Sequence, residues 1–98
     1  MLFALICTDK PGHLQLRQDT RPDHLAFLGK LNDENKLAFA GPFLDAEGKS
    51  NGTLSVIEAA DLEAAKAIAA SDPYARAGLF ENVDVRAWNW VVNKPDAA

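Results

Sequence analysis

The strongest constraint on the fold comes from residues 1–7, MLFALIC, which are apolar throughout. A run of this length, followed by the turn-forming segment TDKPGH, is typical of a β-strand. Neighbouring side chains of a strand point to opposite faces of a sheet, so this run places hydrophobic groups on both faces. The sequence therefore predicts a central strand in a sheet that needs cover on both sides.

Two segments have helical patterns. Thr20 is a candidate N-cap and Pro22 is typical of a first helical turn, so the first helix is predicted to begin at Thr20 and to end near Asn35. Asp61 is a candidate N-cap for a second, alanine-rich helix over residues 62–71.

Three further segments, residues 37–43, 53–59 and 81–92, have the composition of β-strands. Gly41-Pro42 is predicted to stop the first of them, and Asn51-Gly52 is predicted as the turn before the second. The predicted order of elements is βαββαβ.

This order predicts an α+β, ferredoxin-like fold, in which a four-stranded antiparallel sheet carries both helices on one face. Residues 1–98 form a single predicted domain, with residues 93–98 as a flexible C-terminal tail. Residues 81–92 place Trp88 and Trp90 on one side and valines on the other, so the face without helices also needs cover. We expect a homodimer in which two such faces pack together.

Composition excludes several classes of function. The formal net charge is −4 and the basic residues are scattered singly, which argues against a nucleic-acid or anionic-membrane surface. Cys7 is the only cysteine and lies within the apolar N-terminal run, so it is expected to be a buried residue rather than part of a disulfide. That run is too short to span a membrane and lacks the features of a signal peptide, and a cytoplasmic location is expected. The Cys and His residues do not have the spacing of a metal site, and the sequence has neither a glycine-rich phosphate-binding loop nor the nucleophile elbow of serine hydrolases. No metal or cofactor is therefore predicted.

The predicted topology brings polar residues from distant parts of the chain to one end of the sheet. Polar groups that converge beside an apolar core are typical of a small-molecule site. The segments expected there are Thr8-Asp9, His24, Gly41-Pro42, Gly52-Thr53 and Asp72.

His24 and Asp72 are the candidate catalytic pair. His24 lies on the apolar face of its helix, where it could be a hydrogen-bonded core residue or a proton-transfer group. Asp72 precedes Pro73 and could simply cap the short segment PYARA, which ends at Gly78. Both roles are compatible because a carboxylate has two oxygens, one for the cap and one to orient the imidazole.

Five further residues are candidate substrate contacts, each with an ordinary structural alternative. Arg21 could hold an anionic group or be a solvated residue near a helix end. Tyr74 could contact a ligand or be a half-buried aromatic residue, and Thr53 could donate a hydrogen bond or merely favour a strand. Gly41 and Pro42 would form part of the wall of the site.

The ordered set of motifs resembles one known family. RPDHLAFLGKLNDENKLAFAGP followed by DPYARAGLF is similar to the pattern of the YciI-like (YCII-related) family, and the similarity covers essentially the whole chain. The resemblance implies a dimeric α/β barrel of ferredoxin-like subunits, as in muconolactone isomerases and small antibiotic-biosynthesis-type monooxygenases. It also implies an active site at His24 and Asp72. One family relative is linked to dehydrochlorination of a chlorinated hydroxyquinol.

Three functional interpretations stay open at this point. The leading one is a cofactor-independent lyase or isomerase, including dehydrohalogenation, in which the His-Asp pair moves a proton on a small cyclic or aromatic metabolite. The alternatives are a module that binds a small molecule without converting it, and a dimerisation module in which His24 and Asp72 are structural. The similarity in fold to monooxygenases suggests haem binding as a further interpretation. A visible spectrum of the protein with added haem would test it.

Overall fold

A computed structural model describes residues 1–96 of the chain. The helices and strands, in chain order, are β1 (Leu2–Asp9), α1 (Leu14–Asp33), β2 (Leu37–Leu44), β3 (Ser50–Glu58), α2 (Leu62–Ser71), α3 (Pro73–Arg76) and β4 (Phe80–Trp88). Residues 93–96 of the predicted tail contain neither helix nor strand, and residues 97–98 lie outside the described residues. The flexibility of this tail and the single-domain organisation stay predictions.

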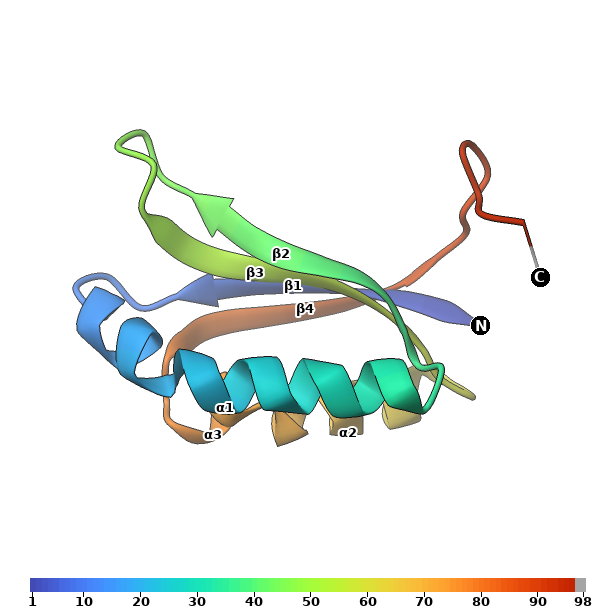
Figure 1. Cartoon of the computed structure of the whole chain (residues 1–98), viewed down its shortest axis with the longest axis horizontal. Helices are drawn as coiled ribbons and strands as arrows, with labels where there is room; N and C mark the ends of the chain where they lie inside the picture. Colours follow the sequence, from blue (N-terminus) through green and yellow to red (C-terminus); the bar gives the residue numbers. More distant parts are fainter. Residues whose placement is uncertain (97–98) are drawn as a thin grey trace.

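The four strands form one antiparallel sheet in the order β2-β3-β1-β4. β1 is therefore internal, as its apolar run predicted, and β2 and β4 are the edges. Figure 1 shows α1, α2 and the short α3 on one face of this sheet. These features confirm the predicted ferredoxin-like fold.

The hydrophobic core lies between the sheet and the helices. Phe3, Leu5 and Cys7 alternate along β1 on the helix side, and Phe3 pairs with Ile57 across to β3. The helices contribute smaller groups, among them Ala65, which is fully buried. Burial of Cys7 is confirmed, with 4% of the residue exposed.

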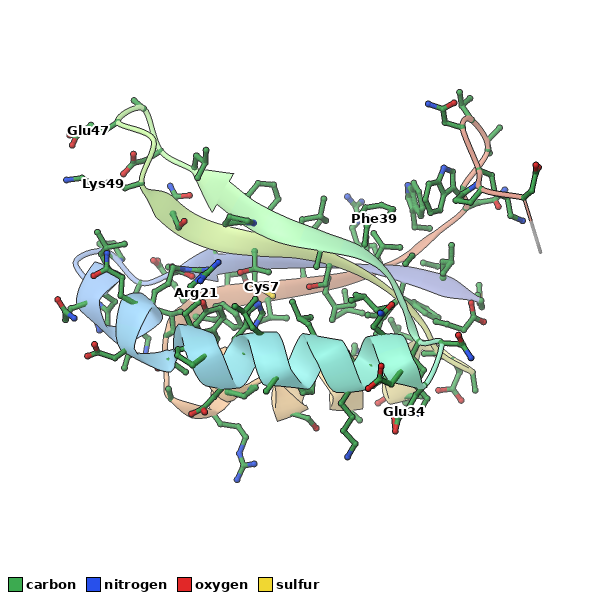
Figure 2. The ribbon with its side chains drawn as sticks, viewed as in Figure 1. Cys7, Arg21, Glu34, Phe39, Glu47 and Lys49 are labelled. Atoms are coloured by element: carbon green, nitrogen blue, oxygen red, sulfur yellow. The ribbon has the colours of Figure 1, made fainter. Side chains whose placement is uncertain are left out.

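The face of the sheet opposite the helices has no cover within the described chain. Phe39, Phe43 and Trp88 are 36%, 40% and 37% exposed, although aromatic side chains are usually buried. Phe39 packs edge-on against Trp88 and Trp90, with ring centroids 5.8 Å and 5.1 Å apart. Figure 2 shows Phe39 on the side of the sheet away from the helices. We call this surface the open face.

The predicted start of the first helix is wrong. α1 begins at Leu14, so Thr20 lies within it, and Pro22 is inside the helix rather than in its first turn. Proline cannot donate to the carbonyl four residues earlier, and helices commonly bend at such a position. Figure 1 shows the first turns of α1 set at an angle to the rest. The helix ends at Asp33, close to the predicted end.

The predicted hairpin between the second and third strands is also wrong in its details. β2 continues through Gly41-Pro42 to Leu44, which is possible because proline is tolerated on an edge strand. Asn51-Gly52 lies within β3, and the turn falls earlier, where Gly48 has a φ of +81°. Gly52 instead allows close contact between strands, since a Cβ there would lie 2.6 Å from the carbonyl oxygen of Cys7.

The last strand is shorter than predicted. β4 ends at Trp88, and residues 89–92 continue away from the sheet as irregular chain. In this segment the indole of Trp90 donates a hydrogen bond to the carbonyl of Val92 at 2.8 Å.

Candidate active site

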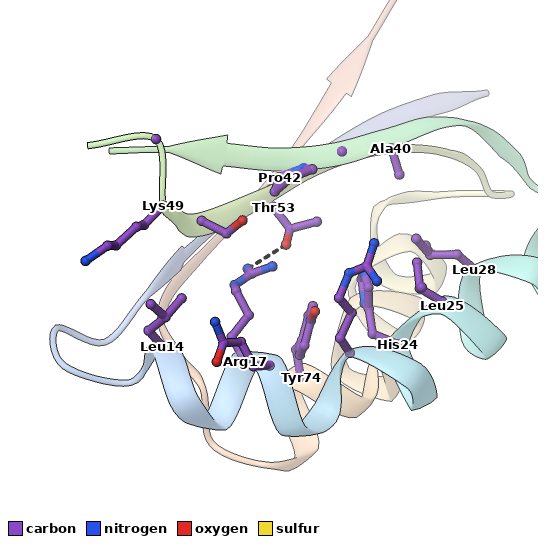
Figure 3. A pocket seen from close by; sticks show the side chains of 15 residues that line it. Leu14, Arg17, His24, Leu25, Leu28, Ala40, Pro42, Lys49, Thr53 and Tyr74 are labelled. Carbon is purple, nitrogen blue, oxygen red and sulfur yellow. Dashed lines mark hydrogen bonds between the residues drawn. The ribbon is translucent and has the colours of Figure 1, made fainter. Parts of the chain in front are cut away.

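A cavity of about 590 Å³ opens between α1 and the β2-β3 hairpin, at the end of the sheet where the topology predicted a site. Six of the seven candidate site residues line it: Arg21, His24, Gly41, Pro42, Thr53 and Tyr74. Asp72, the seventh, contacts His24 without lining the cavity. Figure 3 shows the side chains of α1 facing those of β2 and β3 across this space.

His24 and Asp72 lie within hydrogen-bonding distance. The Nδ1 atom of His24 lies 2.9 Å and 3.1 Å from the two carboxylate oxygens of Asp72. Only 5% of His24 and 7% of Asp72 are exposed. A carboxylate only accepts, so the contact places the proton of a neutral imidazole on Nδ1 and leaves Nε2 as an acceptor.

The second nitrogen of His24 reaches the cavity. Nε2 has no hydrogen-bond partner among residues 1–96. Within the same residues, no fully buried side-chain nitrogen or oxygen lacks a partner, so Nε2 is at least partly exposed, and His24 is one of the residues that line the cavity. An imidazole with one nitrogen held by a carboxylate and the other accessible has the arrangement of a general acid or base.

Asp72 also caps α3, so the cap and the contact with His24 occur together. Its Oδ1 accepts a hydrogen bond from the backbone N–H of Tyr74 at 2.9 Å, and Pro73 occupies the first turn. The bend that ends α2 and starts α3 thereby places the carboxylate beside His24.

Tyr74 is buried more completely than predicted. Only 1% of the residue is exposed, and its ring stacks on the imidazole of His24 with centroids 4.0 Å apart and planes inclined by 21°. Burial raises the pKa of the Tyr74 phenol, and the positive charge of Arg17 opposes that rise.

Arg17 was missed by the sequence reasoning. Its Nε and Nη2 atoms donate to the two oxygens of Asp9 at 2.6 Å and 2.9 Å, and Nη2 also donates to the hydroxyl of Thr53 at 2.7 Å. The guanidinium carbon lies 4.5 Å from the centre of the Tyr74 ring. Burial acts to lower the pKa of Arg17, but the hydrogen bond and charge of Asp9 outweigh it and the pKa is raised.

A sequence signal for Arg17 existed. Arg17, Arg21 and His24 follow the i, i+4, i+7 spacing of one helix face. The mistaken helix start at Thr20 placed Arg17 outside the helix and hid this spacing. Asp9, expected at this end of the sheet but not chosen as a site residue, is its ion-pair partner.

Cys7 lies beneath the site. Burial raises the pKa of its thiol to about 12, and the carboxylates of Asp72 and Asp9 add to the rise. A thiol with this pKa is protonated at neutral pH and is a poor nucleophile.

Within residues 1–96 we find no group of three His, Cys, Asp or Glu side chains arranged to hold a metal ion. None of the helices over this same range is both long and apolar enough to cross a membrane.

Comparisons with known proteins identify relatives along most of the chain. The model of the YCII-related domain matches residues 1–89. Protein YciI of Escherichia coli O6:H1 is 37% identical over 97 residues, which cover 93% of this chain and 99% of that protein. An uncharacterized protein of Haemophilus influenzae is 36% identical over 97 residues, with the same coverage.

Solved structures include a similar enzyme. The 5-chloro-2-hydroxyhydroquinone dehydrochlorinase TftG of Burkholderia phenoliruptrix AC1100, in complex with 2,5-dihydroxybenzoquinone, is 33% identical with a TM-score of 0.83. The alignment covers 91% of this chain and 94% of that one. An antibiotic biosynthesis monooxygenase aligns with a TM-score of 0.54 at 15% identity over 93% of this chain and 99% of that one, which supports the fold alone.

Proposed function

This chain belongs to the YCII-related family, and on that premise we propose that it is an enzyme that moves a proton on a small cyclic or aromatic molecule bearing oxygen. The reaction is of the lyase or isomerase type, such as loss of a hydrogen halide, and proceeds without a cofactor. The observation that carries this proposal is the buried His24 and Asp72 pair, with one imidazole nitrogen accessible from a cavity.

In the proposed reaction His24 accepts or returns a proton through Nε2, and Asp72 acts as a positioning residue. Loss of hydrogen chloride removes one proton and one chloride, and the electron pair of the broken bond to hydrogen stays on the ring as the bond to chlorine breaks. This step therefore requires a base and a site for the ring but no external oxidant. The similarity to TftG, a dehydrochlorinase, supports this class of chemistry.

We also propose that the functional unit is a homodimer that buries the open face. Phe39, Phe43 and Trp88 give that face an apolar surface of the kind that two sheets bury when they pack together. The cavity lies on the helix side of the sheet, so the dimer would leave it accessible.

The test is an activity assay with 5-chloro-2-hydroxyhydroquinone, in which chloride release is measured for the native protein and for His24→Asn and Asp72→Asn. Removal of a positioned general base is expected to lower the rate by about 10²- to 10⁴-fold. Arg76→Lys, an exposed substitution on α3, is the matched control and should keep the native rate. Full activity in both site variants would contradict the proposal.

The main alternative is a module that binds a ring compound without converting it. Titration with 2,5-dihydroxybenzoquinone separates the two functions. Binding that depends on His24, without chloride release from any halogenated hydroquinone offered, would favour the binding module. A purely structural pair predicts that His24→Asn lowers the melting temperature and that no ring compound binds the native protein.

A further inference from the structure

The phenol of Tyr74 carries a proton that no side chain among residues 1–96 accepts. Over this range Tyr74 makes hydrogen bonds through its backbone N–H and its backbone carbonyl, and the phenolic oxygen, Oη, donates none. The polar neighbour of Oη is the guanidinium of Arg17, whose pKa the phenol helps to raise. A guanidinium only donates hydrogen bonds, so it cannot accept the phenolic proton.

This phenol faces the cavity, although only 1% of Tyr74 is exposed. Tyr74 is one of the residues that line the cavity, and Figure 3 shows the hydroxyl end of its ring directed away from α3 and towards β2 and β3. Buried polar groups usually have hydrogen-bond partners, because an unpaired hydroxyl in the interior has lost its interactions with water. The direction of the phenol therefore points to an acceptor that occupies the cavity.

The ring of Tyr74 is held in place on several sides. The imidazole of His24 stacks on it with centroids 4.0 Å apart, and the guanidinium carbon of Arg17 lies 4.5 Å from its centre. Phe80 meets it edge-on at 6.0 Å, and Asp72 accepts a hydrogen bond from its backbone N–H. A donor that is fixed before binding loses little conformational entropy when it binds an oxygen.

The phenol is a neutral donor at neutral pH. Burial raises the pKa of Tyr74 above its ordinary value of 10.0, and the positive charge of Arg17 does not cancel that rise. A neutral phenol donates to the oxygen of an uncharged hydroxyl or carbonyl group, so this contact does not require a charged substrate.

The cavity also offers a surface for the carbon skeleton of a ring. Leu25, Leu28 and Pro42 belong to its lining. The imidazole and the phenol are neighbouring stacked rings, and both His24 and Tyr74 line the same cavity. A single small ring compound can therefore meet Nε2 of His24 at one atom and Oη of Tyr74 at another.

We propose that Tyr74 donates a hydrogen bond from Oη to a hydroxyl or carbonyl oxygen of the bound ring compound, and that this contact selects oxygenated rings over hydrocarbon rings of the same shape. This inference rests on the proposed function, because it takes the cavity beside His24 as the substrate site. The phenol keeps its proton throughout, and proton transfer takes place at Nε2 of His24. Tyr74 thus determines specificity and does not act as a second acid or base.

The experiment compares two molecules of similar shape, hydroquinone and 1,4-dimethylbenzene, in which a methyl group takes the place of each hydroxyl group. Dissociation constants are measured by calorimetry under nitrogen, which prevents oxidation of hydroquinone. The native protein should bind hydroquinone more tightly. Tyr74→Phe removes Oη and keeps the ring, so it should weaken hydroquinone binding by about three- to tenfold without weakening the binding of 1,4-dimethylbenzene.

Ser71→Ala is the matched control. It also removes one hydroxyl group, but this group donates to the backbone carbonyl of Ala67, and Ser71 does not line the cavity. Both affinities of this variant should equal those of the native protein. Binding of 1,4-dimethylbenzene to Tyr74→Phe shows that the cavity of that variant is intact. Native affinity of Tyr74→Phe for hydroquinone, or a native protein that does not prefer hydroquinone, would overturn the inference.

The result also separates this inference from the proposed function. If Tyr74→Phe binds hydroquinone as the native protein does and His24→Asn still lowers chloride release, the proposed function stands and the inference on Tyr74 fails. If Tyr74→Phe weakens hydroquinone binding but chloride release does not depend on His24, the contact stands and the proposed reaction fails. If neither compound binds and chloride release does not depend on His24, both fail.

Discussion

Asp72 makes two contacts, and their joint contribution to stability can be compared with that of a helix cap alone. Asp72→Ala removes the cap of α3 and leaves Nδ1 of His24 without a partner, so a loss of about 2–4 kcal/mol in the free energy of unfolding is expected. Asp61→Ala is the matched control, because Asp61 only caps α2 through the N–H of Ala64, and should cost about 1 kcal/mol. Denaturant unfolding measures both. Equal losses would contradict a structural contribution from the contact with His24.

The buried thiol of Cys7 predicts a loss of stability in alkali. Burial raises its pKa from 9.0 to about 12, so above pH 9 the unfolded chain releases a proton that the folded chain retains. The contribution of this residue to the free energy of unfolding is therefore present below pH 9 and falls as the pH rises towards 12. Denaturant unfolding at several pH values should show this fall.

Cys7→Ala provides the comparison. The variant removes the thiol, so its stability should decline less steeply than that of the native protein over the same range of pH. Its absolute stability should be lower at neutral pH, because a buried side chain becomes smaller. Identical slopes in the two proteins would show that the thiol does not titrate differently in the folded state.

At the scale of the elements, the contact between β1 and β3 depends on Gly52. A Cβ at this position would lie 2.6 Å from a backbone oxygen of Cys7, so Gly52→Ala should force the strands apart and cost about 1–3 kcal/mol. Gly41→Ala on β2 is the control, since a Cβ there meets no atom within 4 Å. Denaturant unfolding should separate the two variants clearly, and equal stabilities would refute the close approach.

The elements that could be predicted from sequence are those with a strong local signal. The apolar run of β1 identified the internal strand, and Asp61 and Asp72 marked real helix caps. Pro22 led to the wrong prediction of the helix start, because proline usually lies in the first turn of a helix, whereas α1 continues through it.

The same error explains what was missed in the site. His24 and Asp72 were found because their chemical types and the topology together brought them to one place. Arg17 lay in a segment not thought to be helical, and one of its partners, Thr53, lies 36 positions further along the chain. Local patterns do not specify such long-range contacts, so the position of Arg17 between Asp9 and Thr53 could be recognised only in three dimensions.

At the scale of the whole molecule, the open face leads to a prediction about assembly. Phe39→Glu places a charge among the aromatic side chains of this surface and should convert the proposed dimer to a monomer, because a buried unpaired charge is costly. Leu62→Glu is the control, since Leu62 is similarly exposed, at 40%, but lies on α2 on the opposite side. Light scattering coupled to gel filtration gives the mass of each variant. A native monomer, or a Phe39→Glu dimer, would contradict the proposal.

The position of Tyr74 has a practical consequence for experiments on this protein. It is the only tyrosine in the chain, and it lies between the guanidinium of Arg17 and the imidazole of His24. The near-ultraviolet absorption of the tyrosine phenol therefore comes from one known position in the molecule. The two tryptophans lie elsewhere, Trp88 at the end of β4 on the open face and Trp90 in the segment after that strand. Difference spectra of the phenol can thus report on the occupancy of the cavity without a label, an attached dye or knowledge of the natural substrate.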